Sequence, residues 1–382
     1  MVDQTSQRGL NRKLRSTRNE PTRALVVAVD LQDPKAPLPP QLDEFVALAR
    51  AAGAEIVGIV AQRRAQVDPA TLVGTGKARE IAETAAELGA NALFIFNGLR
   101  PRQRTNLEKL VPLAIVDRTM LILDVFARHA RSREGKLQVE LAQLRYRQAN
   151  LIGIGTALSR LGGGIGTRGP GETKLEVDRR QIQRRISTLR RALEEVRTQR
   201  ANRRAAHAAE PLVALVGYTN AGKSSLLNRL ASAAEAFVAD QPFATLDPLV
   251  RRVWIGPSTS LRYARDDNFT VRVADTVGFI TDLPEELIAA FRATLEELQS
   301  AALLVHVIDA SNPDWERQAS SVDAILRELG LDERPIVRVF NKVDRGAHSL
   351  QPDALEISAR TGAGIDRLRE AIAGRLLMTT SV

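Results

Sequence analysis

The sequence contains no cysteine among its 382 residues. This absence excludes a disulfide framework, a thiol nucleophile and a cysteine-based zinc site, and it agrees with a reducing compartment. No apolar run approaches the ~18 residues that cross a bilayer. The polar, basic N-terminus also lacks the apolar stretch of a secretory signal. We therefore expect a cytoplasmic protein without a membrane span.

The chain does contain enough apolar sequence for sizeable cores, and its charge is unbalanced. Apolar residues make up 44% of the sequence, which is ordinary for a globular protein. The length suggests two or three domains. The net charge of +9 favours a polyanionic partner, because an excess of lysine and arginine attracts phosphate backbones.

The middle of the chain carries the pattern G-x-x-x-x-G-K-S, which is typical of a phosphate-binding loop. The apolar run Leu212 to Val216 before it predicts a strand, and residues 225–230 after it predict a helix. Glycines leave backbone N–H groups free to surround a phosphate. A lysine reaches the β- and γ-phosphates, and a serine hydroxyl binds Mg²⁺. The predicted nucleotide-binding residues are Gly217, Tyr218, Thr219, Asn220, Ala221, Gly222, Lys223, Ser224 and Ser225, with Ser224 also a Mg²⁺ ligand.

Two further segments complete the predicted phosphate and Mg²⁺ site. Asp275 ends a β-rich run, where its carboxylate can hold Mg²⁺ through water, and Gly278 lets the backbone approach the γ-phosphate. Thr245 lies between the phosphate loop and Asp275, and its hydroxyl can complete the Mg²⁺ shell. The predicted residues of these segments are Phe243, Ala244, Thr245, Leu246, Asp247, Asp275, Thr276, Val277 and Gly278.

Two later segments predict that the base is guanine. A carboxylate at Asp344 can accept from both N1–H and the exocyclic amine of guanine, whereas adenine presents the wrong pattern. We expect the second segment to approach the base from its other side, so the predicted ligands are GTP and GDP. The residues concerned are Asn341, Lys342, Val343 and Asp344, followed by Ser358, Ala359 and Arg360.

No catalytic residue can be named from the sequence. Many small GTPases carry a glutamine after the glycine of this segment to orient the attacking water, but here Phe279 follows Gly278. A phenyl ring cannot hydrogen-bond water, so we predict slow intrinsic hydrolysis, with water positioned by another element or by a partner. Asn220 stands where K⁺-responsive GTPases carry asparagine, which suggests K⁺ as a cofactor beside Mg²⁺.

The N-terminal part is predicted to be a basic tail followed by a small α/β domain. Residues 1–21 read as a disordered tail, which either touches nucleic acid or is simply solvated. Strand and helix patterns then alternate over residues 22–131, which implies a small parallel sheet. The expected strands are 24–29, 55–61, 91–96 and 113–117, and the expected helices are 42–52, 77–88, 102–110 and 120–130.

Within this domain lies the short pattern Gly74-Thr75-Gly76-Lys77. It lacks the four residues that separate the glycines of a phosphate loop. We therefore interpret it as a turn that opens a helix. A second nucleotide site remains the alternative.

Residues 132–205 predict an antiparallel helical hairpin. Leucine and isoleucine recur near heptad spacing in two stretches, the pattern of helices that pack along an apolar seam. Thr173 and Glu176 read as a capping box at the start of the second helix. Between the helices we expect a glycine-rich loop at 152–172, whose backbone could follow a partner surface closely.

The hairpin carries much of the basic charge. From Arg145 to Arg204 there are about 15 basic and about 5 acidic residues, which favours a phosphate backbone as partner. A solvated coiled-coil face is the alternative. Because Tyr146 is the one aromatic residue in this stretch, we expect recognition by shape and charge. The RNA-binding candidates are Arg160, Arg168, Lys174, Arg179, Arg180, Arg184 and Arg185.

Residues 134–144 and 163–173 closely resemble the HflX-type GTPases, as do Asp117-Arg118-Thr119 and Gly74-Thr75-Gly76-Lys77. The nucleotide segments are similar to the five motifs of translation-factor-type GTPases. The resemblance covers about 22 to 377. It implies a cytosolic GTPase that binds the large ribosomal subunit and its rRNA and separates the subunits of stalled or hibernating ribosomes.

In such proteins the glycine-rich loop reaches toward the peptidyl-transferase region, and some members bind ATP through the N-terminal domain. Many members carry a further C-terminal domain, whose contacts cannot be carried over to a sequence that ends at Val382.

The expected fold class is therefore α/β: a small parallel α/β domain at 22–131, the hairpin at 132–205, and a P-loop G domain at 211–377. The G domain is expected to be doubly wound around a mostly parallel sheet. We expect a monomer that acts in ribosome splitting or rescue. The alternatives are an assembly or regulatory GTPase with a protein partner, and an RNA-remodelling NTPase with a second nucleotide site.

Overall fold

The computed structural model describes most of the chain in two compact units. One unit contains residues up to Arg128 together with 143–186, and the other contains 129–142 together with residues from Ser187 onward. The described residues are 21–32, 38–130, 132–161, 170–205, 210–231, 249–255, 269–280, 298–346 and 354–380.

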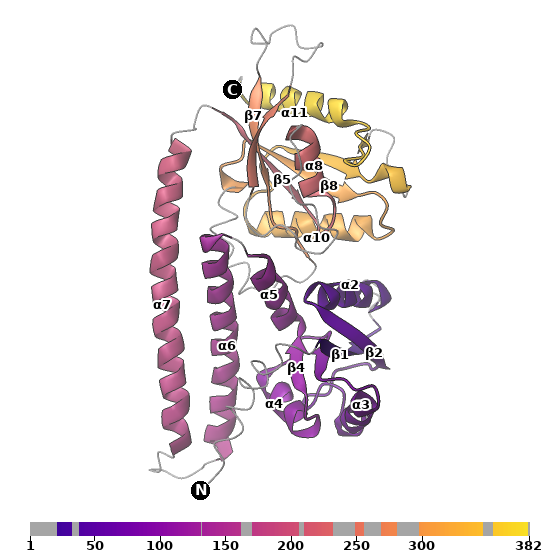
Figure 1. Ribbon diagram of the computed structural model, residues 1–382, viewed down its shortest axis with the longest axis vertical. Helices are drawn as coiled ribbons and strands as arrows, with labels where there is room; N and C mark the ends of the chain where they lie inside the picture. Colours follow the sequence, from indigo (N-terminus) through magenta and orange to yellow (C-terminus); the bar gives the residue numbers. More distant parts are fainter. Residues whose placement is uncertain are drawn as a thin grey trace. The chain divides into compact units, whose positions relative to one another are not determined.

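The first unit contains a parallel sheet with helices between its strands (Figure 1). Its strand order is β2-β1-β3-β4, and each neighbouring pair is parallel. The central strand β1 is almost entirely buried because apolar side chains face both sides of it. The predicted small parallel α/β sheet is confirmed. In chain order the elements are β1 Thr22–Asp30, α2 Leu38–Ala51, β2 Ala54–Arg63, α3 Thr75–Glu87, β3 Ala92–Ile95, α4 Pro101–Leu110, β4 Ala114–Asp117 and α5 Arg118–His129.

Gly74 is the N-cap of α3, with φ at +86°. An L side chain is strained in that conformation, so glycine suits the turn into the helix. Lys77 lies in the first turn, and its Nζ atom is 2.5 Å from Oε1 of Glu80. The interpretation of this pattern as a helix-opening turn is confirmed.

The predicted hairpin corresponds to two long helices, α6 Arg133–Leu161 and α7 Pro170–Ala205. Nε2 of Gln148 donates a 2.6 Å hydrogen bond to Oε1 of Gln183, which joins the two helices. Of the predicted seam, Leu141, Ile186, Leu189 and Leu193 are buried.

Two predicted boundaries in the hairpin were wrong. The loop predicted at 152–172 is shorter, because α6 continues to Leu161 and α7 already begins at Pro170. Gly153 and Gly155 are tolerated inside a helix at a cost of about 1 kcal/mol each. Thr173 consequently lies inside α7, and Pro170, whose fixed φ suits a first helical position, begins the helix instead. Residues 162–169 lie outside the described residues.

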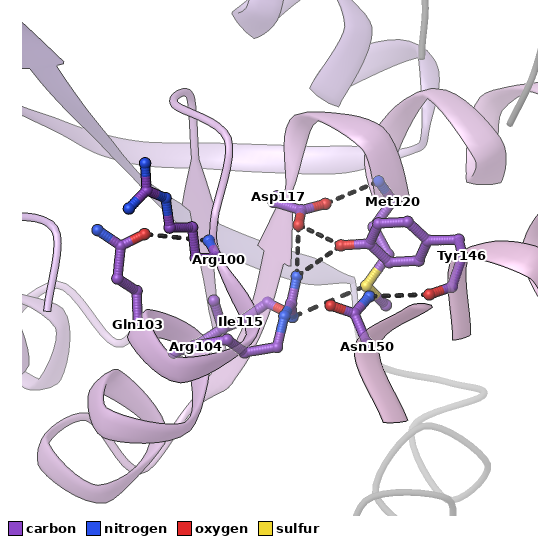
Figure 2. A network of polar contacts seen from close by, with 8 residues as sticks. All are labelled: Arg100, Gln103, Arg104, Ile115, Asp117, Met120, Tyr146 and Asn150. Atoms are coloured by element: carbon purple, nitrogen blue, oxygen red, sulfur yellow. Dashed lines mark hydrogen bonds and ion pairs between the residues drawn. The ribbon is translucent and has the colours of Figure 1, made fainter. Parts of the chain in front are cut away.

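A polar network attaches α6 to the end of β4 (Figure 2). Asp117 accepts hydrogen bonds from the amide of Met120 at 2.9 Å, from Nη2 of Arg104 at 2.6 Å and from the hydroxyl of Tyr146. Nη1 of Arg104 also donates to the carbonyl of Ile115 at 2.7 Å. Asp117 is 3% exposed, so its charge is balanced almost entirely by these donors.

The second unit contains a six-stranded sheet with the order β10-β9-β8-β5-β7-β6 (Figure 1). All neighbouring pairs are parallel except β6 with β7. This arrangement confirms the predicted mostly parallel sheet. Its elements are β5 Leu212–Gly217, α8 Lys223–Ala231, β6 Leu249–Trp254, β7 Thr270–Asp275, β8 Leu303–Asp309, α10 Trp315–Glu328, β9 Ile336–Asn341, the 3₁₀ turn η1 Val343–Arg345, β10 Leu355–Glu356 and α11 Ile365–Thr380.

The central strands β5 and β8 are buried because they are apolar on both faces, whereas the edge strand β6 is mostly exposed. Their carboxyl ends carry the loops that follow Gly217, Asp275 and Asn341, so those loops share one edge. No helix in the described part of the chain is both long and apolar enough to cross a membrane.

Candidate functional site

The predicted phosphate loop connects β5 to α8, as the sequence pattern requires. Gly217 has φ at +153°, and a Cβ atom there would lie 2.3 Å from the carbonyl oxygen of Val307. Gly222 has φ at +93°, and its Cβ would lie 2.3 Å from Nδ2 of Asn341. Only glycine fits both positions, because a side chain would force the backbone of the loop outward.

Lys223 is buried at the centre of this loop, with 6% of the residue exposed. Its Nζ atom donates to the carbonyls of Gly217 at 3.0 Å and Tyr218 at 2.9 Å. Burial lowers the pKa of Lys223 from 10.5 to about 8, although Asp275 opposes the shift. An anion next to this ammonium group would be strongly stabilised, because water does not screen the charge there.

Ser224 and Asp275 form a pair of oxygen groups beside the loop. The Ser224 hydroxyl donates to Oδ2 of Asp275 at 2.6 Å. Asp275 reaches this position because β5 and β7 are paired in register, with Leu215 opposite Asp275. Thr276 anchors the turn by donating from Oγ1 to the Leu215 carbonyl at 2.6 Å. A hydroxyl and a carboxylate fit Mg²⁺, which prefers oxygen ligands and often keeps waters and phosphate oxygens in its shell.

The segment after Asp275 lies directly against the phosphate loop. The amide of Phe279 donates to the Gly217 carbonyl at 3.1 Å, and the amide of Thr219 donates to the Phe279 carbonyl at 2.7 Å. A Cβ on Gly278 would lie 2.8 Å from Cα of Thr219 and 3.2 Å from Nζ of Lys223. Phe279 itself is 2% exposed, so its ring belongs to the core.

On the guanine side, Asn341 connects three segments. Its Nδ2 atom donates to the Ala221 carbonyl at 2.8 Å, and its Oδ1 atom accepts from the Ala359 amide at 2.9 Å. Asn341 is 2% exposed. Its side chain therefore joins the phosphate loop to the segment 358–360.

Asp344 is oriented by Ser358. The Ser358 hydroxyl donates to Oδ1 of Asp344 at 2.7 Å, and this hydrogen bond holds the pKa of Asp344 below its usual value. Nη1 of Arg360 lies 3.9 Å from Oδ2 of the same carboxylate. Lys342 has φ at +67°, and its Nζ atom is 2.8 Å from Oδ2 of Asp309. The Asp344 carboxylate is therefore ionised at neutral pH and held in one orientation.

The remaining predicted site residues either lie outside the described residues or are exposed on α7. Residues 243–247, which include Thr245, lie outside the described residues, as do the side chains of Arg160, Arg168 and Lys174. Arg179, Arg180, Arg184 and Arg185 lie exposed on α7, and Arg180 pairs with Glu176 at 2.9 Å.

Sequence reasoning missed three contributors to the site. The backbone of Phe279 pairs with the phosphate loop, Asp309 holds Lys342, and Arg229 donates to the segment 358–360. No sequence pattern pointed to Asp309 or Arg229, because each acts through a contact with a distant part of the chain.

Three family models match the chain in order. Residues 40–127 match a GTP-binding GTPase N-terminal family and residues 129–207 match a GTP-binding GTPase middle region. Residues 212–342 match a family described as 50S ribosome-binding GTPase. The matches follow one another without overlap along most of the sequence.

Curated relatives are similar over most of their length. The GTPase HflX of Caldanaerobacter subterraneus subsp. tengcongensis is 46% identical over 347 residues, which covers 89% of this chain and 78% of the relative. The GTPase HflX of Escherichia coli K12 is 44% identical over 346 residues, covering 88% of this chain and 79% of the relative.

Among solved structures, a GTP-binding protein from Sulfolobus solfataricus in complex with GDP is 23% identical and has a TM-score of 0.46. The alignment covers 93% of this chain and 99% of that one.

Proposed function

This chain belongs to the HflX family of GTPases and hydrolyses GTP, and from that premise we propose that it binds the large ribosomal subunit and its rRNA. GTP binding and hydrolysis would control that association and lead to ribosome splitting or rescue. Support comes from the match of residues 212–342 to a 50S ribosome-binding GTPase family. We assign the control by guanine nucleotide to the G domain, residues 211–377. We assign the contact with RNA to the helical hairpin, residues 132–205, which is called the arm below.

Each group of the site has a role in this proposal that follows from its chemistry. The loop 217–225 surrounds the phosphates with backbone N–H groups, and the buried ammonium of Lys223 faces them as a point charge. Ser224 and Asp275 would hold Mg²⁺, with Thr245 as a further ligand. When bound, Mg²⁺ neutralises charge on the β- and γ-phosphate oxygens.

Guanine selectivity would come from Asp344. Its ionised carboxylate is aimed by Ser358, and it can accept from the two donors on one edge of guanine. Adenine presents a bare ring nitrogen at the first position and lacks the second donor, so the carboxylate would be left without partners there. The arrangement of Ser358 and Asp344 is the single observation that best supports guanine over adenine.

Hydrolysis by the isolated protein is proposed to be slow. The ring of Phe279 is buried and apolar, so it offers no hydrogen bond to an attacking water. Its backbone instead holds the segment 275–279 against the phosphate loop. A group supplied by the ribosome, or by another element of the chain, would position the water.

The arm is proposed to bind rRNA by charge and shape. Arg179, Arg184, Arg190 and Arg191 are exposed along α7, and arginines on one long helix can contact successive phosphates. The segment 152–172 would extend this contact toward the peptidyl-transferase region. We expect the protein to act as a cytoplasmic monomer.

Sedimentation of the full chain with purified 50S subunits tests the proposal. We expect co-sedimentation with a non-hydrolysable GTP analogue, weaker binding with GDP, and loss of binding when residues 162–169 are replaced by a short linker. Affinity should fall steeply from 50 to 200 mM salt, by about tenfold or more, because phosphate contacts release counterions. Equal binding in every nucleotide state, with the loop intact or removed, contradicts the proposal.

Salt dependence separates the competing functions. An assembly or regulatory GTPase with a protein partner would bind that partner with little salt dependence. An RNA-remodelling NTPase would need a second nucleotide site near Lys77, whose Nζ atom is already paired with Glu80. Binding of ATP that persists after Lys223→Met and disappears after Lys77→Met would favour that function.

A further inference from the structure

Arg229 lies in the last turn of α8 and reaches across to the loop that follows β10. Its Nε atom donates to the Ala359 carbonyl at 3.0 Å. Its Nη2 atom donates to the next carbonyl, that of Arg360. One planar guanidinium therefore holds two successive peptide groups, a geometry that arginine provides and lysine cannot.

The loop held by Arg229 is a tight turn with little freedom of its own. The Ser358 hydroxyl accepts from the Thr361 amide at 3.0 Å, and the Gly362 amide donates to the Ser358 carbonyl at 2.8 Å. Gly362 has φ at +93°, and a Cβ there would lie 3.9 Å from Cζ of Arg229. The turn thus leaves the carbonyls of Ala359 and Arg360 on the side facing α8.

Asn341 holds the same peptide segment from its other side. Ala359 donates its amide to Asn341 at 2.9 Å and presents its carbonyl to Arg229 at 3.0 Å. Asn341 in turn donates to the Ala221 carbonyl at 2.8 Å, two residues before α8 begins. The two ends of α8 are therefore linked, through Asn341 and Arg229, to one short segment. Helix α8, which is rigid and roughly 13 Å long, connects these two contacts.

We propose that Arg229 is a positioning residue for guanine recognition. By fixing residues 358–360, it keeps the Ser358 hydroxyl on Asp344 and so holds the carboxylate that reads the base. Loss of the guanidinium would free the loop, speed the release of guanine nucleotide and weaken discrimination between purines. This inference depends on the proposed guanine site at Asp344.

The chain offers a matched control at the same end of α8. Nη2 of Arg369 donates to the Leu230 carbonyl at 3.4 Å, one residue from Arg229, while its Nη1 atom pairs with Asp366 at 3.2 Å. In the described part of the chain, Arg369, which lies on α11, makes no hydrogen bond or ion pair with residues 358–362. Arg369→Met therefore removes an arginine that contacts this end of α8 and leaves the loop held.

The experiment compares full-length Arg229→Met, Arg229→Lys and Arg369→Met with the unaltered protein. Release of a fluorescent GDP is followed by stopped flow, and dissociation constants are measured for GDP, IDP and ADP. IDP lacks the exocyclic amine that Asp344 would read. Thermal unfolding without nucleotide checks that each variant is folded. If Arg229→Met does not fold, Arg229→Lys, which retains one donor group, takes its place in the comparison.

We expect Arg229→Met to release GDP about tenfold faster, because two hydrogen bonds from a charged donor are lost. The preference for GDP over IDP should fall at least about threefold, with Arg229→Lys intermediate and Arg369→Met unchanged. Equal weakening of GDP, IDP and ADP, or no change in release, overturns the inference while leaving the proposed function intact. If the unaltered protein binds ADP as tightly as GDP, the proposed guanine site is wrong, and the inference fails with it.

Discussion

The hydroxyl of Ser224 and the carboxylate of Asp275 are 2.6 Å apart, although the two residues are 51 positions apart in the chain. The hydrogen bond joins the first turn of α8 to the end of β7. It brings together the two oxygen groups that Mg²⁺ would need on the protein side, next to the loop that would hold the phosphates.

Replacing Asp275 tests this arrangement. Asp275→Asn removes the negative charge and keeps the shape, so we expect Mg²⁺-dependent GTP affinity to fall by about tenfold or more. Titration of fluorescent nucleotide with and without Mg²⁺ measures the effect. In EDTA the variant should bind GDP about as well as the unaltered protein, and an equal loss with and without Mg²⁺ contradicts the assignment.

The lowered pKa of Lys223, about 8, predicts proton uptake on nucleotide binding. In the free protein the ammonium loses its proton as the pH rises through about 8. Bound phosphate favours the charged form and raises that pKa again, so binding near pH 8.5 should take up a fraction of one proton and weaken as the pH rises. Calorimetry in buffers of different ionisation enthalpy measures the uptake. Lys223→Arg, whose guanidinium stays charged throughout this pH range, should remove the uptake, and uptake that persists in that variant assigns the proton elsewhere.

Asp344→Asn should change which base is bound. An asparagine amide can donate to the 2-oxo group of xanthine, whereas it meets the exocyclic amine of guanine with its own donor unless it turns over. We expect GDP affinity to fall by about a hundredfold and XDP affinity to rise, as measured by competition against a fluorescent nucleotide. A variant that keeps its GDP preference shows that another group reads the base.

K⁺ is predicted to stimulate GTP hydrolysis through Asn220. This residue has φ at +61° within the phosphate loop, and a cation bound beside it could neutralise charge that develops on the phosphates. Hydrolysis should be faster in KCl than in NaCl at equal ionic strength, and Asn220→Ala should remove the difference. Equal rates in the two salts for the unaltered protein dispose of this idea.

The hydrogen-bond network of Figure 2 predicts that a substitution within it lowers the stability of the protein and leaves its nucleotide affinity unchanged. Burial and the neighbouring Asp117 raise the pKa of Tyr146, so its hydroxyl stays protonated and donates to Asp117. Tyr146→Phe should lower the free energy of unfolding of this unit by about 1–3 kcal/mol, since the buried carboxylate loses one donor. Urea unfolding measures this loss, with GDP affinity as the control. Unchanged stability means that Arg104 and Met120 suffice for Asp117.

The sequence by itself predicted the parts whose chemistry is local. The phosphate loop could be recognised because glycine, lysine and serine at fixed spacing have few other uses between a strand and a helix. The alternating N-terminal strands and helices were also predicted, since buried parallel strands leave apolar runs bounded by turn residues. The nature of the base followed from the donor and acceptor pattern that a carboxylate at Asp344 can satisfy.

Only the tertiary structure decided how these local parts hold one another. Asn341 was predicted as a nucleotide-binding residue, yet its side-chain amide links Ala221 to Ala359. Arg229, at the far end of α8, donates a hydrogen bond to the same Ala359. These partners are brought together by strand order and register, which depend on the packing of the whole sheet. The end of α6 was decided in the same way, because neither glycine content nor spacing shows whether a helix continues through Gly153 and Gly155 to Leu161.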